Sequence, residues 1–260
     1  MKVVSFNANG IRSAARKGFF DWLAREKADF VCLQEIRAQK EDLASEVQYF
    51  PDKYYCEYVE GVKKGYSGVA IYARKKPINI IQKLGFESCD EEGRYLQFDY
   101  DTFSVISLYM PSGTSGDMRQ LVKFDFLERF AKHLQTLKVL GRELIICGDF
   151  NIAHQKIDIK NWQANQKHSG FLPEERAWLD ELFGSMGFVD AFRLKNQEAL
   201  EYTWWSHRGR ARANNVGWRI DYQVITPGLV DHVSSVAIYR DQFFSDHAPV
   251  LIEYRGLEDD

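Results

Sequence analysis

Short apolar runs that end in polar or turn residues recur along the chain, and this pattern predicts β-strands. Turn residues such as Lys63-Lys64-Gly65 and Lys76-Pro77 separate many of the runs, and strands spaced this closely favour antiparallel pairs. The predicted strands cover residues 2–6, 29–33, 54–59, 68–73, 78–81, 95–100, 103–109, 144–147, 202–205, 220–225, 233–239 and 249–254.

Apolar residues with helical spacing predict helices between these strands. The longest predicted helix covers residues 117–140, where Phe124, Leu127 and Leu134 share one face, and Gly141 ends it. The segment from Ala153 to Phe171 is long, polar and irregular, which is typical of a functional or disordered loop. Shorter helices are predicted over 41–47 and 173–186. Another is predicted after Ser13, its candidate N-cap, with Phe19, Phe20, Trp22 and Leu23 on its apolar face.

The run from Leu144 to Cys147 contains no polar residue, which predicts a strand buried on both faces. Gly148 then allows a tight turn or the close approach of a ligand. Asp149 and Asn151 lie on the same side if the strand period of two continues. A carboxylate beside an amide could hold water, a metal ion and a charged oxygen together. An ordinary Asx turn after a strand would give the same pattern, so this segment alone does not decide the function.

Polar residues occur at the ends of several predicted strands. In mixed α/β sheets such residues often converge on one cleft, which favours one compact domain over residues 1–260 with one site. No Pro/Gly/Ser-rich linker, low-complexity run or convincing short repeat divides the chain. The strand-end residues are Asn7, Glu35, Tyr109, Asp149 and Asp221, and Asp246-His247 precede the last strand.

Composition places the chain among globular proteins, with 45% hydrophobic residues and mixed charges. No apolar stretch approaches the ~20 residues that a membrane helix needs, and the N-terminus is strand-like rather than a signal peptide. These features predict a cytoplasmic protein with no membrane partner. The net charge of −3 does not indicate nucleic-acid binding, so a polyanion site would need local clustering of basic residues. Buried free thiols are the expected state of Cys32, Cys56, Cys89 and Cys147.

Seven segments stand out along the chain: 5–12 (SFNANGIR), 33–35 (LQE), 67–70 (SGVA), 109–111 (YMP), 148–154 (GDFNIAH), 217–222 (GWRIDY) and 245–249 (SDHAP). Taken in order, they resemble the exonuclease III type of abasic-site endonuclease, which belongs to the wider endonuclease/exonuclease/phosphatase superfamily. The resemblance covers essentially the whole chain. It implies an α/β (α+β) fold: a four-layer α/β sandwich of two mixed β-sheets packed face to face, with helices outside and the site at one rim.

The resemblance implies hydrolysis of the phosphodiester on the 5′ side of an abasic deoxyribose, leaving a 3′-hydroxyl and a 5′-deoxyribose phosphate. Glu35 is the best single metal ligand, with Asn7 beside it, and Asp246 is a candidate for a second metal. Such oxygen ligands suit Mg²⁺ or Mn²⁺. The number of metals stays open. The full candidate set for metal binding is Asn7, Glu35, Asp149, Asn151, Asp246 and His247.

The same resemblance assigns catalytic roles. Asp149 is the candidate to orient and deprotonate the attacking water, or to hold a hydroxide on a metal. Asn151 would donate a hydrogen bond to the transition-state oxygens, and Tyr109 would add a second donor or assist the leaving group. His247 would contact the phosphate, with Asp221 holding its ring.

Substrate recognition is expected from other residues. Trp204, Trp218 and Ile220 match the family's apolar pocket for an extruded sugar without a base, whereas Trp205 is expected in the core. His168 stands where the family has asparagine, and Arg37 where it has lysine. The basic loop at Arg208, Arg210 and Arg212 would contact phosphates or enter a groove. Further candidate backbone contacts are Arg37, Ser112, Arg119, Asn165 and His168.

The expected partner is double-stranded DNA with abasic sites or blocked 3′ ends, bound by a monomer at the bacterial nucleoid. Exonuclease and 3′-phosphatase or phosphodiesterase side activities are expected at the same site. Alternatives are another hydrolase of the superfamily, a DNA-binding module without catalysis, or a structural or interaction protein, which no repeat or exposed apolar stripe in the sequence supports. The segment 202–218, with its aromatic residues and arginines, favours the abasic-site branch over the first. The competent residues at every expected catalytic position argue against the second.

Overall fold

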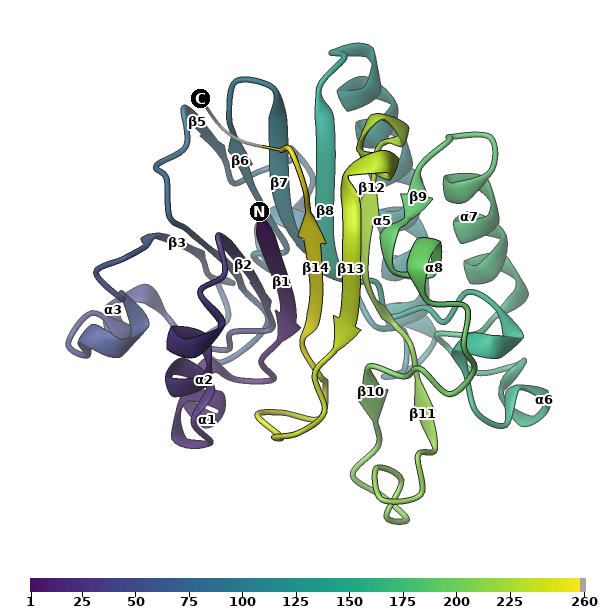
Figure 1. Ribbon diagram of the computed structural model, residues 1–260. Helices are drawn as coiled ribbons and strands as arrows, with labels where there is room; N and C mark the ends of the chain where they lie inside the picture. Colours follow the sequence, from purple (N-terminus) through teal and green to yellow (C-terminus); the bar gives the residue numbers. More distant parts are fainter. Residues whose placement is uncertain (258–260) are drawn as a thin grey trace.

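Two six-stranded mixed β-sheets lie face to face in the computed structural model, which describes residues 1–257 (Figure 1). In the first sheet the order is β13 (Val233–Ile238), β14 (Val250–Tyr254), β1 (Lys2–Asn7), β2 (Phe30–Gln34), β4 (Val69–Ala73) and β3 (Tyr55–Val59). In the second it is β5 (Asn79–Ile81), β6 (Tyr95–Asp99), β7 (Phe103–Tyr109), β8 (Glu143–Asp149), β12 (Asp221–Ile225) and β9 (Val189–Asp190). The pairs β1/β2 and β7/β8 are parallel and the other pairs are antiparallel.

Helices cover the outer faces of the two sheets. The first sheet packs against α1 (Ile11–Arg16) and α2 (Phe19–Glu26), and the second against α5 (Asp117–Val139) and α7 (Pro173–Phe183). A small two-stranded sheet, β10 (Trp204–Trp205) with β11 (Gly217–Trp218), projects at the lower edge in Figure 1. The remaining helices are α3 (Lys40–Leu43), α4 (Glu87–Asp90), α6 (Trp162–Asn165) and α8 (Ala191–Lys195), with 3₁₀ turns at Val47–Tyr49, Lys156–Asp158 and Pro227–His232.

Successive side chains along each strand pack into different layers of the core. On β8, Ile145 and Cys147 join the core between the two sheets, whereas Leu144 and Ile146 join the core under α5 and α7. Successive side chains point to opposite faces of a strand, so a wholly apolar run requires cover on both sides. The strand predicted to be buried on both faces is therefore confirmed, and so is the four-layer α/β sandwich.

Some elements differ from the sequence prediction because they are short. The two-residue strands β9 and β11 have too few positions to show alternation, and the sequence pattern missed them together with α4, α6 and α8. The single helix expected after Ser13 is two helices: Ser13 lies inside α1, and Gly18 precedes α2. The predicted helix over 41–47 is the single turn α3 followed by a 3₁₀ turn. Cys32, Cys89 and Cys147 are buried thiols, and Cys56 is partly buried and also free. No helix within residues 1–257 combines the length and apolar composition needed to cross a membrane.

Strand register brings polar side chains into one row at the rim. Asp149, the last residue of β8, is paired with Tyr109 on parallel β7 and with Asp221 on antiparallel β12. In the facing sheet, parallel β1 and β2 end together at Asn7 and Gln34. The predicted convergence of strand-end residues therefore follows from the register of the strands on both sheets.

Candidate active site

One cavity of about 510 Å³ opens at this rim. Three carboxylates line it: Glu35 from just after β2, Asp149 from the end of β8, and Asp246 from the loop before β14. Tyr109 and His247 line the same cavity. Asn7 and Asp221 lie directly behind it, since each is hydrogen-bonded to a lining side chain. The structure thus brings together all the residues that were expected to be catalytic or metal-binding.

Asp149 is buried at the centre of this group. The side-chain amide of Asn7 donates to Asp149 Oδ2 over 2.8 Å, and the backbone N–H of Asn151 donates to Oδ1 over 2.8 Å. Burial, and next the charge of Asp221, raise the pKa of Asp149 to about 7, although His247 acts in the opposite direction. A carboxylate with such a pKa can accept a proton at neutral pH, as a general base must.

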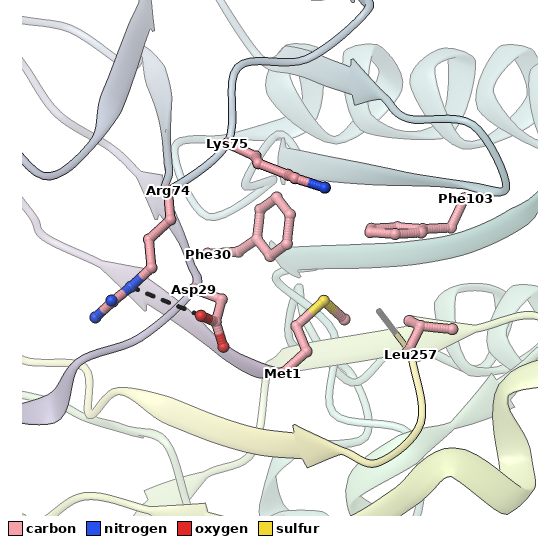
Figure 2. A pocket seen from close by; sticks show the side chains of 7 residues that line it. All are labelled: Met1, Asp29, Phe30, Arg74, Lys75, Phe103 and Leu257. Atoms are coloured by element: carbon pink, nitrogen blue, oxygen red, sulfur yellow. Dashed lines mark ion pairs between the residues drawn. The ribbon is translucent and has the colours of Figure 1, made fainter. Parts of the chain in front are cut away.

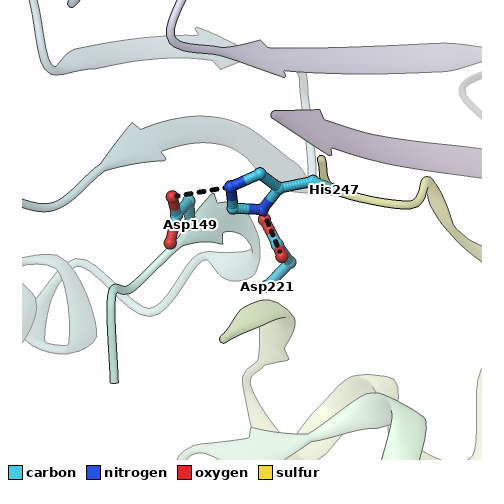
Figure 3. Close-up of side chains that lie close together, drawn as sticks. All are labelled: Asp149, Asp221 and His247. Atoms are coloured by element: carbon cyan, nitrogen blue, oxygen red, sulfur yellow. Dashed lines mark hydrogen bonds and ion pairs between the residues drawn. The ribbon is translucent and has the colours of Figure 1, made fainter. Parts of the chain in front are cut away.

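His247 is held between two carboxylates (Figure 3). Its Nδ1 lies 2.8 Å from Asp221 Oδ2, and its Nε2 lies 3.9 Å from Asp149 Oδ2. Burial alone would lower the pKa of His247, but Asp221 and then Asp149 raise it to about 10. The ring is therefore a cation at neutral pH, with Nδ1–H donated to Asp221 and Nε2–H on the side of Asp149.

Asn7 bridges the two carboxylates at the ends of the facing sheets. Its Oδ1 accepts from the backbone N–H of Asn9 at 2.9 Å, and this directs its NH₂ group to Asp149 and to Glu35 Oε2 at 3.1 Å. The other oxygen of Glu35 pairs with Arg37 over 2.5 Å. Glu35 has φ of +52°, a left-handed conformation that an ordered site must hold in place.

The donor set fits a hard divalent cation. Oxygen atoms of Glu35, Asp149 and Asp246 face one cavity, and such ligands are typical of Mg²⁺ and Mn²⁺. Ligand atoms of Asp149, Asp221 and His247 also lie within 4.8 Å of one another. Asp221 Oδ1 is buried with no hydrogen-bond partner among the described residues, so an additional donor or cation would stabilise it.

Tyr109 and Asn151 flank Asp149. The guanidinium of Arg94 lies 4.7 Å from the centre of the Tyr109 ring and donates to the Tyr109 carbonyl over 2.8 Å. Burial, and then the charge of Glu35, raise the pKa of Tyr109, so its hydroxyl remains a proton donor. The Asn151 amide donates to the carbonyl of Met110 over 2.9 Å.

The three predicted pocket residues line the same cavity. Trp204 and Trp218 meet edge to face, with ring centres 6.0 Å apart, and Ile220 packs in the same apolar cluster. These three side chains form the apolar pocket, and the carboxylates of Glu35, Asp149 and Asp246 form the acidic centre. The indole N–H of Trp204 donates to Asp246 Oδ2 over 3.1 Å and so joins the two directly. Trp205 is buried in a different cluster, which confirms the expectation that it belongs to the core.

The candidate DNA contacts fall into two groups. Arg37, Ser112, Arg119, Asn165 and His168 all line the cavity, and Arg119 is held there by two hydrogen bonds to Glu92. The basic loop lies between β10 and β11, away from the cavity lining, and Arg208 and Arg210 are exposed on it.

Arg212, in the same basic loop, differs from its two neighbours. Its guanidinium lies 3.6 Å from the centre of the Phe243 ring and donates to the Ser245 carbonyl over 2.8 Å. Burial lowers the pKa of Arg212 to about 10. Because these contacts occupy the side chain, Arg212 supports the loop that carries Asp246 and His247, whereas Arg208 and Arg210 remain exposed.

Several residues that organise the site were not predicted from the sequence. Asn9 donates to Asp246 over 2.8 Å, and Thr203 Oγ1 accepts from the backbone N–H of Asp221. The Asn-x-Asn pattern after the first strand could have revealed Asn9. Lys123 and Glu175 are buried behind Asn151, but on amphipathic helices such residues look like ordinary surface charges, so no sequence signal marks them.

A second cavity, of about 350 Å³, lies near the other ends of the strands (Figure 2). Figure 2 shows Phe30 and Phe103 among the side chains that line it, together with the ion pair of Arg74 and Asp29, whose atoms are 3.6 Å apart. This cavity contains one carboxylate and no histidine, so it lacks the converging acidic groups of the first. The chemistry described above is therefore placed at the rim that contains Asp149.

Comparisons with known proteins relate nearly the whole chain to nucleases. The sequence profile described as the Endonuclease/Exonuclease/phosphatase family matches residues 4–247. An exodeoxyribonuclease of Bacillus subtilis is 38% identical over 253 residues, which cover 96% of this chain and 98% of the relative. The DNA repair nuclease APEX1 of Danio rerio is 35% identical over 260 residues, covering 97% of this chain and 81% of the relative. An AP endonuclease structure from Archaeoglobus fulgidus matches with a TM-score of 0.89 and 26% identity, covering 98% of this chain and 99% of that one.

Proposed function

The chain belongs to the endonuclease/exonuclease/phosphatase family, and on this premise we propose that it is a DNA repair hydrolase acting at abasic sites. It cleaves the phosphodiester on the 5′ side of an abasic site in duplex DNA and leaves a 3′-hydroxyl and a 5′-deoxyribose phosphate. Removal of nucleotides or blocking groups from 3′ ends would use the same bond chemistry at the same site.

One observation carries this proposal: the acidic centre and the apolar pocket share one cavity and are joined by the hydrogen bond from Trp204 to Asp246. Carboxylates and a histidine alone would serve any phosphodiesterase of the family. An apolar pocket directly beside them suits a sugar that lacks its base, because an abasic nucleotide costs least to extrude and a normal base would not fit.

The residues of the cavity supply the functions that the reaction needs. Asp149, whose pKa is about 7, orients the attacking water and takes its proton. The cationic ring of His247 contacts a phosphate oxygen, and Asn151 donates a hydrogen bond to another. Tyr109, still protonated, assists the leaving 3′-oxygen.

A divalent cation, Mg²⁺ or Mn²⁺, would be held by Glu35 and Asp149, with Asn7 and Asp246 as further candidates. When bound, it supplies positive charge beside the phosphate oxygens. In this structure the NH₂ group of Asn7 donates to Glu35 and Asp149. The side-chain amide would therefore have to rotate before its oxygen could bind the cation. Asn151 and His247 complete the candidate set, but His247 would have to lose a ring proton before it could bind a metal, so its role as a cation beside the phosphate is the one proposed here.

Contacts to the DNA backbone would come from Arg37, Ser112, Arg119, Asn165 and His168 around the cavity, with Arg208 and Arg210 contacting the duplex farther away. The protein would act as a monomer, since a single incision requires no symmetric partner. Its place of action would be the nucleoid, where a bacterial-type enzyme meets chromosomal DNA.

The first experiment compares two duplexes, one with a single tetrahydrofuran site and one intact, in Mg²⁺ and in EDTA. Incision only at the lesion, lost in EDTA and in Asp149→Asn, is the expected result. Equal cutting of both duplexes would move the protein to a non-specific nuclease branch of the family. Failure of the folded protein to cut either duplex would reject the proposal and direct attention to phosphorylated small molecules or lipids.

A further inference from the structure

A buried ion pair lies directly behind the proposed catalytic amide. Lys123 on α5 and Glu175 in the first turn of α7 are both fully buried, and Lys123 Nζ lies 2.5 Å from Glu175 Oε1. The same ammonium donates to the backbone carbonyl of Asn151 over 2.8 Å. Neither charge reaches the cavity itself, since neither residue lines it.

Glu175 holds the end of the long loop that borders the cavity. Its Oε2 accepts from the backbone N–H groups of Gly170 at 2.6 Å and Leu172 at 3.1 Å. The Gly170 carbonyl in turn accepts from the N–H of Ala153 at 2.8 Å. One carboxylate therefore joins the loop, helix α7 and the segment that follows β8.

Asn151 depends on these contacts because its backbone is in the left-handed region, with φ of +51°. Its N–H is bonded to Asp149, its side-chain amide to the Met110 carbonyl, and its own carbonyl to Lys123. Asparagine adopts this conformation more readily than most residues, but the surrounding structure must still hold it. Lys123 donates the bond to the carbonyl of Asn151 and so restrains the peptide on its C-terminal side.

Stability alone does not account for charges at this position. Replacing a buried ion pair by apolar residues of similar size is often neutral or stabilising, because burial removes both charges from water. An apolar pair would, however, leave the Asn151 carbonyl without its donor.

We propose that Lys123, paired with Glu175, is a positioning residue that fixes the backbone of Asn151 so that its side-chain amide faces the reacting phosphate. This inference rests on the proposed function, in which Asn151 donates to a phosphate oxygen. It assigns to Lys123 an effect on turnover through Asn151, with no contact to DNA or metal.

The test is a double-mutant cycle on the tetrahydrofuran duplex. Lys123→Met leaves Glu175 unpaired and can unfold the protein, so Lys123→Met/Glu175→Gln is used beside it. We expect kcat to fall about ten- to a hundredfold with little change in KM. In an Asn151→Ala background the same substitutions should cause almost no further loss, since they act through Asn151. If the Lys123 substitutions lower kcat by the same factor in the wild-type and Asn151→Ala proteins, the proposal is overturned.

Leu134→Ala is the matched control, because Leu134 is fully buried on the same helix, about three turns beyond Lys123, in the apolar core of that layer. It should lower the melting temperature and leave kcat unchanged. An equal loss of kcat in this control would show that destabilisation alone explains the result.

Hydrogen exchange provides a readout that does not need catalysis. The backbone amides of residues 151–153 should exchange faster in the Lys123→Met/Glu175→Gln protein than in the wild type or in Leu134→Ala. Unchanged protection of these amides would overturn the positioning role even if turnover falls. If the wild type cuts no lesion duplex, the proposed function fails, and hydrogen exchange still decides whether Lys123 restrains Asn151.

Discussion

His247 Nδ1 lies 2.8 Å from Asp221 Oδ2, and both side chains are buried. The two residues come from different segments, the loop before β14 and the start of β12. Burial would favour a neutral ring, so the charge of Asp221 keeps His247 protonated, with a pKa of about 10. This pair keeps a cationic imidazole in the lining of the cavity.

Asp221→Asn keeps the size of the side chain and removes its charge, so the pKa of His247 should fall. Activity that needs the cationic ring would then be lost at lower pH than in the wild type. We expect the alkaline limb of the pH–kcat profile to move to lower pH, with kcat at neutral pH down about 10- to 100-fold. A profile identical in position and height to that of the wild type would contradict this role for the pair.

Asp149→Asn should lower kcat by about a hundred- to ten-thousandfold, because the proposed general base is removed. The wild-type acid limb should lie at or below pH 7, because the pKa of Asp149 is about 7 without a cation and a cation bound beside the carboxylate lowers it; activity falls as the pH drops and the carboxylate is protonated. Single-turnover rates between pH 5 and 8 at fixed Mg²⁺ measure this. A wild-type rate that does not change over this range would exclude Asp149 as the titrating base.

Two substitutions of Trp204 should distinguish the effect of pocket shape on lesion preference from the effect of its hydrogen bond to Asp246. Trp204→Phe keeps an aromatic wall and loses the bond to Asp246, so lesion preference should persist with a modest loss of kcat. Trp204→Ala removes the wall, and the ratio of kcat/KM for lesion over intact duplex should fall about tenfold or more. Trp205→Phe serves as a control for a tryptophan outside the cavity. An unchanged ratio in Trp204→Ala would reject the pocket assignment.

The arginines of the basic loop should differ in function according to their exposure to solvent. Arg208→Ala/Arg210→Ala should weaken DNA binding and reduce the slope of log K against log salt by about 2, as expected for two lost phosphate contacts. Arg212→Ala should instead lower thermal stability, because its guanidinium packs on Phe243 and bonds to the Ser245 carbonyl. Fluorescence anisotropy at several salt concentrations, with melting curves, distinguishes them. Equal salt slopes in the double variant and the wild type would remove Arg208 and Arg210 from the interface.

Asp158 should stabilise the fold in a pH-dependent way. Burial would raise its pKa, but Arg219 and then Arg193 lower it to about 2. A carboxylate with a lowered pKa contributes stability above its unfolded pKa of about 4, and that stability is lost as the pH falls towards 2. Asp158→Asn should cost about 2 kcal/mol or more at pH 7 in urea unfolding, and less near pH 3. The exposed change Asp125→Asn is the control, and a pH-independent loss in Asp158→Asn would contradict this account.

Local pattern was sufficient to predict most of the strands, the long helix and the buried strand β8. The alternation of side chains and the turn residues between runs are properties of neighbouring residues, so they can be read from a linear sequence. The family resemblance added the sandwich architecture and the candidate residues. Elements of two to five residues, such as β9, β11 and α8, were missed because a segment that short cannot show a periodic pattern of apolar residues.

The sequence by itself therefore determined which side chains occur at the strand ends, and that carboxylates, an amide and a histidine are among them. Only the tertiary structure decided how they meet: the register that pairs Asp149 with Asp221, and the bond from Trp204 to Asp246. It alone placed Lys123 behind Asn151. Burial and charge pairing act between residues far apart in the chain, so charge, pKa and positioning are fixed by the packed fold and not by local pattern.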